Sequence, residues 1–252
     1  MNFFLKLAFL FCIGSLLGWC IELLFRRFFS AKKWINPGFL VGPYLPLYGF
    51  SLCTLYLLAM LEEFIPISFP VLRKLVLFAV MALCVTAIEY VTGLIFIKRL
   101  KIKLWDYSDC WGNVDGVICP LFTFFWALLS AAYYFLIHPH ILGALEWLAQ
   151  NLAFSFFIGV FYGVFAIDLV HSTRFLAVIR RFADDKKIVV RYEELKEHIS
   201  EKLRQDRVRG RAKLKDFFAV YSVPPLGEHL KSYYEKVMKN IEDRRSGNKK
   251  KK

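Results

Sequence analysis

Three carboxylates lie within or beside long apolar stretches of the chain, and they are Glu22, Glu89 and Asp168. Burying a carboxylate in hydrocarbon is costly, so such residues mark proton or cation relays or contacts to a polar substrate. Glu89 stands well inside its apolar stretch, which favours the functional interpretation. For Glu22 and Asp168 the sequence favours positions at the membrane surface. Arg26 follows Glu22 at helical spacing and is its expected partner. His171 stands in the same relation to Asp168.

A second group of polar side chains follows Glu89 along the chain. Carboxylate and hydroxyl oxygens at this density suit either a divalent cation or acid–base chemistry. A single D-x-x-D spacing lacks the second acidic cluster that two-metal enzymes need. We therefore favour a capped turn whose aspartates neutralise neighbouring lysines, and we predict neither a metal site nor a catalytic residue. The loop motif consists of Trp105, Asp106, Tyr107, Ser108 and Asp109, with Asp115 further along.

Familiar catalytic and nucleotide-binding motifs are missing from the sequence. It contains no Walker A motif, G-x-S-x-G, H-E-x-x-H or dinucleotide fingerprint. Its six cysteines form no C-x-x-C pair at zinc spacing. We expect a protein that is not an enzyme and holds no cofactor. If it belongs to an ATP-driven transporter, the ATPase is a separate chain.

The composition is that of a membrane protein, with 57% hydrophobic and 17% aromatic residues among 252. Several apolar stretches approach or exceed the roughly 20 residues that a helix needs to cross a bilayer. Inside hydrocarbon the backbone must satisfy its own hydrogen bonds, which at these lengths requires helices. The sequence therefore predicts an all-α, polytopic membrane helix bundle. Its five expected transmembrane helices cover residues 3–25, 41–61, 71–97, 118–137 and 147–170.

Basic residues predict the orientation of these helices, because Lys and Arg in short connections favour the cytoplasm. Lys6, Arg73 and Lys74 argue for the opposite orientation, but they are outnumbered. We expect a multi-pass protein of the cell membrane, with its N-terminus outside and its C-terminus in the cytoplasm. The first and third connections carry Arg26, Arg27, Lys32 and Lys33, and Lys98, Arg99, Lys101 and Lys103.

The charge distribution separates three regions. Residues 1–171 form the expected transmembrane domain, 172–245 an amphipathic helical tail in the cytoplasm, and 246–252 a disordered Lys-rich end. Residues 172–252 hold 23 Lys or Arg and 12 Asp or Glu, which accounts for 11 of the net charge of +13.

Two apolar stripes at helical spacing support the helical tail, and a break at Pro224, Pro225 and Gly227 separates them. The basic residues alternate with acidic ones, so most form a solvated face. Adsorption to anionic lipid headgroups is the best functional interpretation. No nucleic-acid-binding module is recognisable, so we expect no nucleic-acid partner. The stripes are Tyr192, Leu195, Ile199 and Leu203, then Leu230, Tyr234, Val237 and Ile241.

The first and third connections look like copies of one design. Aligning residues 34–49 with 111–126 without gaps places Asn36 on Asn113 and Pro43 on Pro120. Each block follows an apolar stretch that bears a carboxylate, Glu22 or Glu89, and then a short run of basic residues. The two blocks therefore suggest a parallel repeat of two helical hairpins, although short Asn, Gly and Pro loops also match by chance. We add Asn36 and Asn113 to the candidate residues of a polar path between the hairpins.

Several unusual motifs in this order resemble a bacterial family of small multi-helix membrane proteins, the putative ABC-transporter type IV, or CmpB-like, permeases. The resemblance covers approximately residues 18–139 and not the tail, and Val117 replaces a basic residue of the common pattern. It implies an integral membrane protein classed as a permease, with no established substrate. The motifs are W-x-N-P-G-F-x-x-G-P-Y-x-P-x-Y-G from Trp34, E-Y-x-T-G from Glu89, W-D-Y-S-D from Trp105 and N-x-x-G-x-x-C-P-L-F from Asn113.

Three hypotheses about function remain open from the sequence. The first is a permease component for a small polar solute or ion, with Glu89 as the inner carboxylate of a path between the hairpins. The second is a membrane anchor or sensor whose tail binds anionic lipid or a partner protein. The third, a membrane-embedded enzyme at residues 106–115, has the least support. Five helices make a small pore, so a homo-oligomer is compatible with the first hypothesis.

Overall fold

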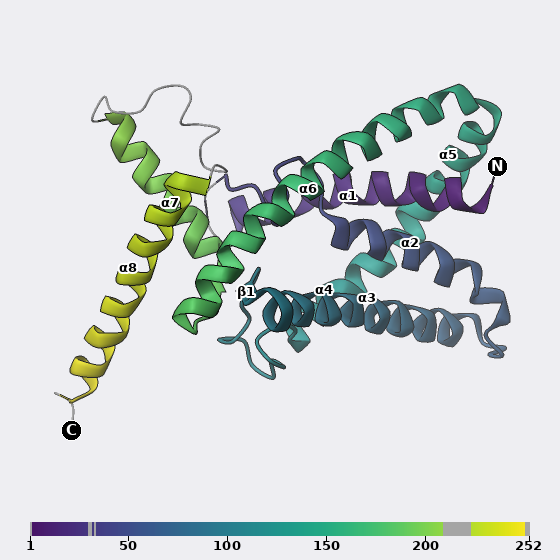
Figure 1. Ribbon diagram of the computed structural model, residues 1–252. Coiled ribbons are helices and arrows are strands. Elements are labelled where there is room, and N and C mark those ends of the chain that lie inside the picture. Colours follow the sequence, from purple (N-terminus) through teal and green to yellow (C-terminus); the bar gives the residue numbers. More distant parts are fainter. Residues whose placement is uncertain (1, 30–31, 33, 209–222, 250–252) are drawn as a thin grey trace. The chain divides into compact units, whose positions relative to one another are not determined.

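The computed structural model describes residues 2–29, 32, 34–208 and 223–249, and they are almost entirely helical (Figure 1). The chain divides into two compact units. The first comprises residues 1–95 and 106–172, and the second comprises residues 96–105 and 173–252. Two long helices, α3 (Pro70–Leu100) and α6 (Ser155–Lys186), begin in the first unit and end in the second.

The first unit confirms the predicted all-α membrane helix bundle. Within the described residues, four helical stretches are long and apolar enough to cross a membrane: Phe3–Phe28, Pro70–Leu100, Pro120–Gln150 and Leu152–Lys186. Large apolar side chains such as Ile95, Phe156 and Ile167 are exposed on them, as expected of helices that face lipid.

Two of the predicted helix boundaries are wrong. The predicted second transmembrane helix, 41–61, is reduced to α2 (Pro46–Met60), whose 15 residues fall short of a full span. Pro43 lies before this helix, although it falls within the predicted range. A short 3₁₀ turn, η1 (Glu62–Phe64), follows it.

The predicted loop at residues 138–146 is also absent. Helix α4 (Pro120–Ala132) continues through a π-helical turn, η2 (Tyr133–Ile137), into α5 (His138–Gln150). Pro139 stands in the first turn of α5, where its missing N–H does little harm. A 3₁₀ turn, η3 (Leu152–Phe154), then leads into α6.

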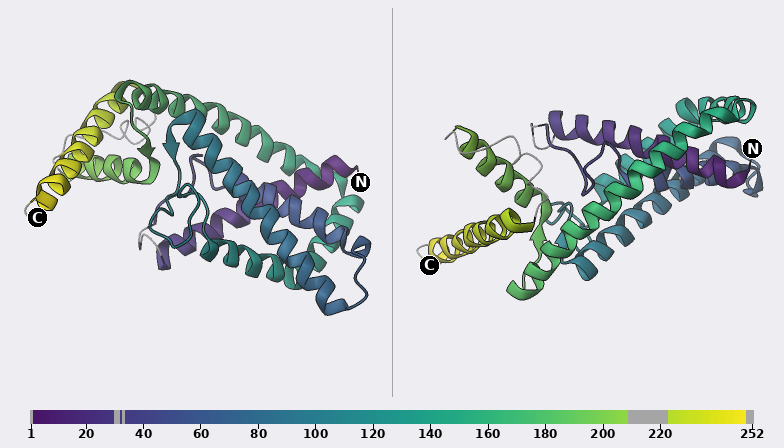
Figure 2. Two further views of the ribbon diagram at one scale, coloured as in Figure 1. Left: turned by 90° about the horizontal axis from the view of Figure 1, so that it is seen from below. Right: turned by 45° about the horizontal axis from the view of Figure 1, so that its top comes forward.

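Small residues bring α1 (Phe3–Phe28) and α2 into close contact, and the two helices pack side by side (Figure 2). A Cβ atom added at Gly18 would lie 2.1 Å from Cβ of Tyr48, and one added at Gly14 would lie 2.8 Å from Cβ of Leu52. Helices in membranes associate through such small residues because the backbones can then approach. The close approach places Tyr48 directly against α1.

The apolar core of the first unit lies between α1, α2, α3 and the α4–α5 stretch. Its buried members include Leu10, Leu55, Tyr56, Leu77, Met81, Val85, Trp126, Tyr133, Ile141 and Leu145. The core therefore joins both predicted hairpins.

The second unit is a small helical domain with its own core. Strand β1 (Ile102–Lys103) pairs in parallel with β2 (Val190–Arg191), and β2 leads into α7 (Tyr192–Val208). Helix α8 (Val223–Lys249) contacts α7. The buried apolar residues include Ile102, Phe175, Leu176, Ile179, Val190, Tyr192, Leu195, Ile199, Leu226, Leu230 and Tyr233.

This core changes the picture of the tail. Tyr192, Leu195 and Ile199 of the first predicted stripe are buried, whereas Leu203 lies outside the residues whose side chains are described. In the second stripe Leu230 is buried, but Ile241 is 40% exposed. Instead, Tyr233 is the buried aromatic residue of α8. The buried stripe residues pack within a protein core.

The end of the tail also differs from expectation. Helix α8 begins at Val223 and runs through the predicted break at 224–227. It continues to Lys249, within the end for which the sequence predicts disorder. Residues 250–252 lie outside the described residues.

Candidate functional site

Glu89 is a buried carboxylate on α3, with 3% of its surface exposed. Nε1 of Trp126 donates a hydrogen bond to its Oε2 at 2.9 Å, and the hydroxyl of Tyr107 donates to its Oε1 at 3.2 Å. Among the described residues, no Lys or Arg pairs with it. The site therefore holds a carboxylate by neutral aromatic donors alone.

The sequence around Glu89 explains how these donors reach it. Trp126 stands in the second turn of α4, which begins at Pro120. Gly93 lies one helical turn after Glu89, and a Cβ atom there would meet Cγ1 of Val117 at 2.2 Å. This glycine lets the 106–119 loop approach α3 closely, so that both donors face the same carboxylate.

Tyr107 is held in the loop by contacts on both its backbone and its ring. Its N–H donates to the carbonyl of Gly116 at 2.8 Å, and its ring stacks on Phe122 with centroids 4.2 Å apart. Burial, and then the negative charge of Glu89, hold the pKa of Tyr107 above its usual range. The hydroxyl therefore stays protonated and donates its hydrogen bond at physiological pH.

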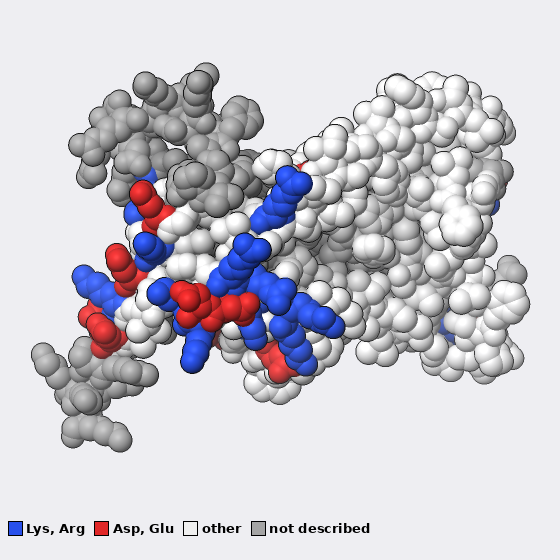
Figure 3. Space-filling view, viewed as in Figure 1, with Lys and Arg blue, Asp and Glu red and all other residues white. Residues whose placement is uncertain are grey.

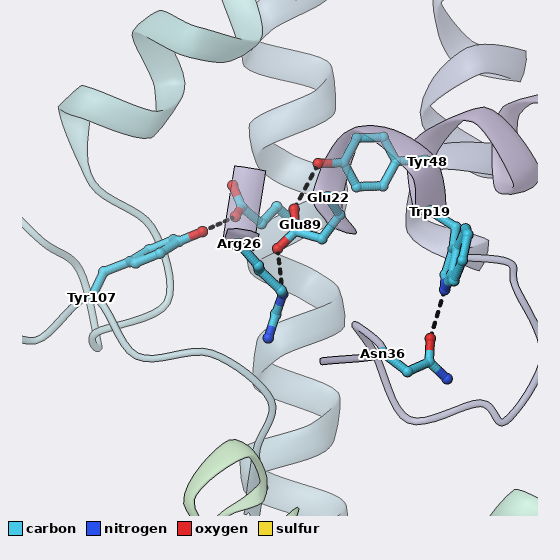
Figure 4. Close-up of polar contacts among 7 residues, drawn as sticks. All are labelled: Trp19, Glu22, Arg26, Asn36, Tyr48, Glu89 and Tyr107. Atoms are coloured by element: carbon cyan, nitrogen blue, oxygen red, sulfur yellow. Dashed lines mark hydrogen bonds and ion pairs between the residues drawn. The ribbon is translucent and has the colours of Figure 1, made fainter. Parts of the chain in front are cut away.

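Glu22 has the basic partner that Glu89 lacks. Nε of Arg26 lies 2.9 Å from Oε1 of Glu22, so the ion pair expected from their spacing is present. The hydroxyl of Tyr48 on α2 donates to Oε2 at 3.1 Å. Figure 4 shows Glu22 and Glu89 near each other, with these partners around them.

The aromatic donors of the two carboxylates contact each other. The ring centroid of Tyr48, which holds Glu22, lies 5.3 Å from that of Trp126, which holds Glu89. Each predicted hairpin thus contributes a carboxylate on its first helix and an aromatic donor near the start of its second. We call Glu22, Arg26, Tyr48, Glu89, Tyr107 and Trp126 the paired-carboxylate site.

Asn36 and Asn113, the candidate residues of a polar path, each form hydrogen bonds within or beside their own connection. Nδ2 of Asn36 donates to the carbonyls of Leu40 and Val41, at 3.1 and 2.9 Å, and its Oδ1 accepts from Nε1 of Trp19 at 2.6 Å (Figure 4). Asn36 therefore stabilises the connection between α1 and α2.

Asn113 does the same in the second loop. Its Nδ2 donates to the carbonyls of Ser108 and Cys110, at 3.1 and 2.9 Å, and Oδ1 accepts from the N–H of Gly116 at 3.1 Å. Asp115 and Gly116 have positive φ angles, 55° and 64°, which a tight turn requires.

The aspartates of the loop do not converge. Asp106 accepts from the N–H and hydroxyl of Ser108, whereas Asp115 accepts from the hydroxyl of Tyr90 at 2.9 Å. Asp109 is exposed. Trp105, the first residue of the loop motif, is half-buried and belongs to the second unit. A search of the described residues for three or more metal-ligating side chains finds no group.

Asp168 accepts hydrogen bonds from the connection between α1 and α2, not from His171. Its carboxylate receives the N–H of Gly42 at 2.8 Å, the N–H of Val41 at 3.0 Å and the hydroxyl of Tyr44 at 2.6 Å. The hydroxyl of Ser172 adds a fourth donor at 2.9 Å. The predicted helical pair with His171 is not formed, because other residues donate the hydrogen bonds described for Asp168 and His171 is exposed. This geometry fits an anchor for the first connection.

The sequence pointed to the carboxylates of the site and named Tyr107 in the loop motif, but not the aromatic donors Tyr48 and Trp126. Tyr48 and Trp126 lie 26 and 37 residues from the carboxylates they hold, and no local spacing relates them. One signal was available. Both stand shortly after the proline that opens a helix, Pro46 or Pro120, in the helix that follows each carboxylate.

Comparison with known protein families identifies the chain. Residues 9–173 match the family described as "Putative ABC-transporter type IV". The chain belongs to this family. The match extends beyond the resemblance seen in the sequence motifs and includes α6 as far as Thr173. Searches of curated proteins and of solved structures gave no match. This membrane bundle is therefore that of a transporter-related protein.

Proposed function

We propose that this protein is a permease component that conducts a small polar solute or an ion across the bacterial inner membrane, without enzymatic activity of its own. The observation that carries the proposal is Glu89, a buried carboxylate on a membrane-spanning helix with only neutral donors around it. Such a group takes up a proton or a cation when one reaches it.

The contrast between Glu22 and Glu89 supports different roles for the two carboxylates. Arg26 neutralises Glu22, whereas Glu89 keeps its charge or takes a proton. Two carboxylates in such different environments are a common basis for proton transfer. In this proposal Glu89 is the group that titrates, and Glu22 holds Arg26 and Tyr48 in place.

We place the paired-carboxylate site toward the cytoplasm. Arg26 and Arg27 lie in the last turn of α1, and Lys98 and Arg99 lie in the last turn of α3. Basic residues at helix ends favour the cytoplasmic side. The N-terminus is then outside and the C-terminus inside. In a transporter of the ATP-driven kind, a separate ATPase chain would bind on that side.

The folded second unit favours a protein partner over a lipid surface. Acidic and basic side chains mix across it (Figure 3), with ion pairs such as Arg191–Glu194 and Arg180–Asp184. Anionic lipid attracts clusters of like charge more strongly than such a mixture. We therefore propose that this unit binds the ATPase or another protein.

Proton flux into proteoliposomes tests the role of Glu89. Protein reconstituted into vesicles loaded with a pH-sensitive dye is exposed to a pH step. We expect wild-type flux above that of empty vesicles and about tenfold less flux for Glu89→Gln, which keeps the shape but cannot exchange a proton. Glu201→Gln changes an exposed carboxylate and serves as the control. Wild-type flux in the folded Glu89→Gln variant would contradict the proposal.

A further inference from the structure

A second Arg–Glu–Tyr cluster lies at the other end of α2. Glu62 stands in η1, directly after α2, and Arg73 stands in the first turn of α3. Nε of Arg73 lies 3.6 Å from Oε1 of Glu62, and the hydroxyl of Tyr134 donates to its Oε2. We call Glu62, Arg73 and Tyr134 the second cluster. It has the same three residue types as the first cluster, Glu22, Arg26 and Tyr48.

The two clusters lie at opposite ends of the same helix. Tyr48 belongs to the first turn of α2, whereas Glu62 follows its last residue. Fourteen residues separate them in the sequence, which in a helix corresponds to about 20 Å. This distance is a large part of a bilayer core of about 30 Å. Each end of the bundle therefore has one Arg–Glu–Tyr cluster.

The second cluster joins three parts of the bundle. Glu62 extends from the end of α2, Arg73 belongs to α3, and Tyr134 belongs to the π-helical turn that links α4 to α5. π-Helical turns occur frequently at functional sites because they displace side chains from the regular helical positions. Loss of the contacts to Glu62 would remove the polar link among these three parts.

The ion pair of the second cluster is looser than that of the first. The Arg73 to Glu62 distance of 3.6 Å exceeds the 2.9 Å between Arg26 and Glu22. Nε of Arg73 is buried and has no hydrogen-bond partner among the described residues. An incompletely satisfied buried group lowers the cost of separating the pair. The second cluster is thus the easier of the two to open.

Further polar and aromatic groups surround it. Nζ of Lys74 lies 5.4 Å from the ring centroid of Tyr134. The hydroxyl of Tyr133 lies 2.8 Å from Nδ1 of His138, whose ring stacks with that of Tyr134 at 6.3 Å. The Tyr133–His138 pair offers a proton further partners at this end of the bundle, whereas Lys74 adds a second positive charge beside Arg73.

We propose that Glu62, Arg73 and Tyr134 form a gate that closes the end of the bundle opposite the paired-carboxylate site. A proton or cation that binds Glu62 replaces Arg73 as its partner, and η1, α3 and the π-helical turn then separate. This inference rests on the proposed transport function. The second cluster then has a role of its own, closing one end of the bundle, in addition to the role of Glu89 in transport.

Hydrogen–deuterium exchange of the full-length protein in detergent tests closure without any knowledge of the solute. We expect Glu62→Gln to raise exchange about tenfold in peptides covering residues 62–74 and 133–138, and to leave residues 106–119 unchanged. The charge exchange Glu62→Arg with Arg73→Glu should restore protection. Glu146→Gln, an exposed carboxylate on α5, is the matched control. Unchanged exchange, or an equal rise across the whole bundle, would overturn the gate.

Proton flux separates failure of the gate from failure of the proposed function. We expect Glu62→Gln to raise basal flux about threefold, because that end no longer closes. If Glu89→Gln abolishes flux while Glu62→Gln alters neither flux nor exchange, the gate is wrong and the proposed function stands. If wild-type protein shows no flux, the proposed function fails, and closure is decided by the exchange result alone.

Discussion

At the scale of single residues, the donors around each carboxylate determine what it can do. Trp126 and Tyr107 give Glu89 hydrogen bonds without a compensating full charge. Arg26 gives Glu22 such a charge. In an apolar bundle this difference leaves Glu89 as the carboxylate for which a proton or cation is the missing partner.

The residues of the site could be predicted only in part. An ionisable residue in an apolar stretch is visible in the sequence, and Glu22, Glu89 and Asp168 were found in this way. Arg26 was also predicted as the partner of Glu22, but Tyr48 and Trp126 were not, because they reach the carboxylates through tertiary packing. Glu62 was not among the candidate residues, although it contacts Arg73 of α3 and Tyr134 of the π-helical turn.

Asp168→Asn tests the anchoring contacts of the first connection. An amide cannot accept from four donors as a carboxylate does, so we expect the free energy of unfolding to fall by about 2 kcal/mol. Chemical unfolding in detergent, followed by circular dichroism, measures this change. Asp185→Asn, which alters an exposed acid on the same helix, should change it by less than about 0.5 kcal/mol. Equal effects of the two variants would contradict the anchor.

At the scale of helices, prolines and glycines determine how the hairpins are built. Pro46 and Pro120 are the first residues of α2 and α4. Gly18 lets α2 pack closely against α1, and Gly93 lets the 106–119 loop pack closely against α3. The sequence predicted helices wherever apolar stretches were long. It missed the continuity of α4 with α5, because a polar stretch at 138–140 with Pro139 reads as a loop although the proline fits a first turn.

Gly18→Ala and Gly143→Ala form a matched pair for the packing of α1 against α2. A Cβ atom at Gly18 would meet the Cβ of Tyr48, whereas none lies near Gly143. We expect Gly18→Ala to destabilise the protein by about 2 kcal/mol or more, and Gly143→Ala to stabilise it by up to about 1 kcal/mol. Chemical unfolding distinguishes them, and similar values for both would contradict the close packing.

At the scale of the whole molecule, the two units show different limits of sequence reasoning. An apolar bundle is recognisable from composition alone, since hydrocarbon demands long apolar helices. The second unit was expected to be an amphipathic tail on lipid, because an apolar stripe does not reveal whether lipid or protein covers it. Leu195 and Leu230 are covered by protein. In the second unit, strands β1 and β2 pair although they lie almost 90 residues apart in the sequence, and no local sequence pattern predicts such a pairing.

The most direct test of the transport role is to follow proton flux as Glu89 is modified. A hydrophobic carbodiimide reacts with protonated carboxyl groups inside the membrane, and mass spectrometry gives the modified fraction of each carboxylate. We expect flux to fall in proportion to the fraction of Glu89 modified and to reach that of Glu89→Gln when modification is complete. Flux that persists with Glu89 fully modified, or that is lost while Glu89 is intact, would contradict it.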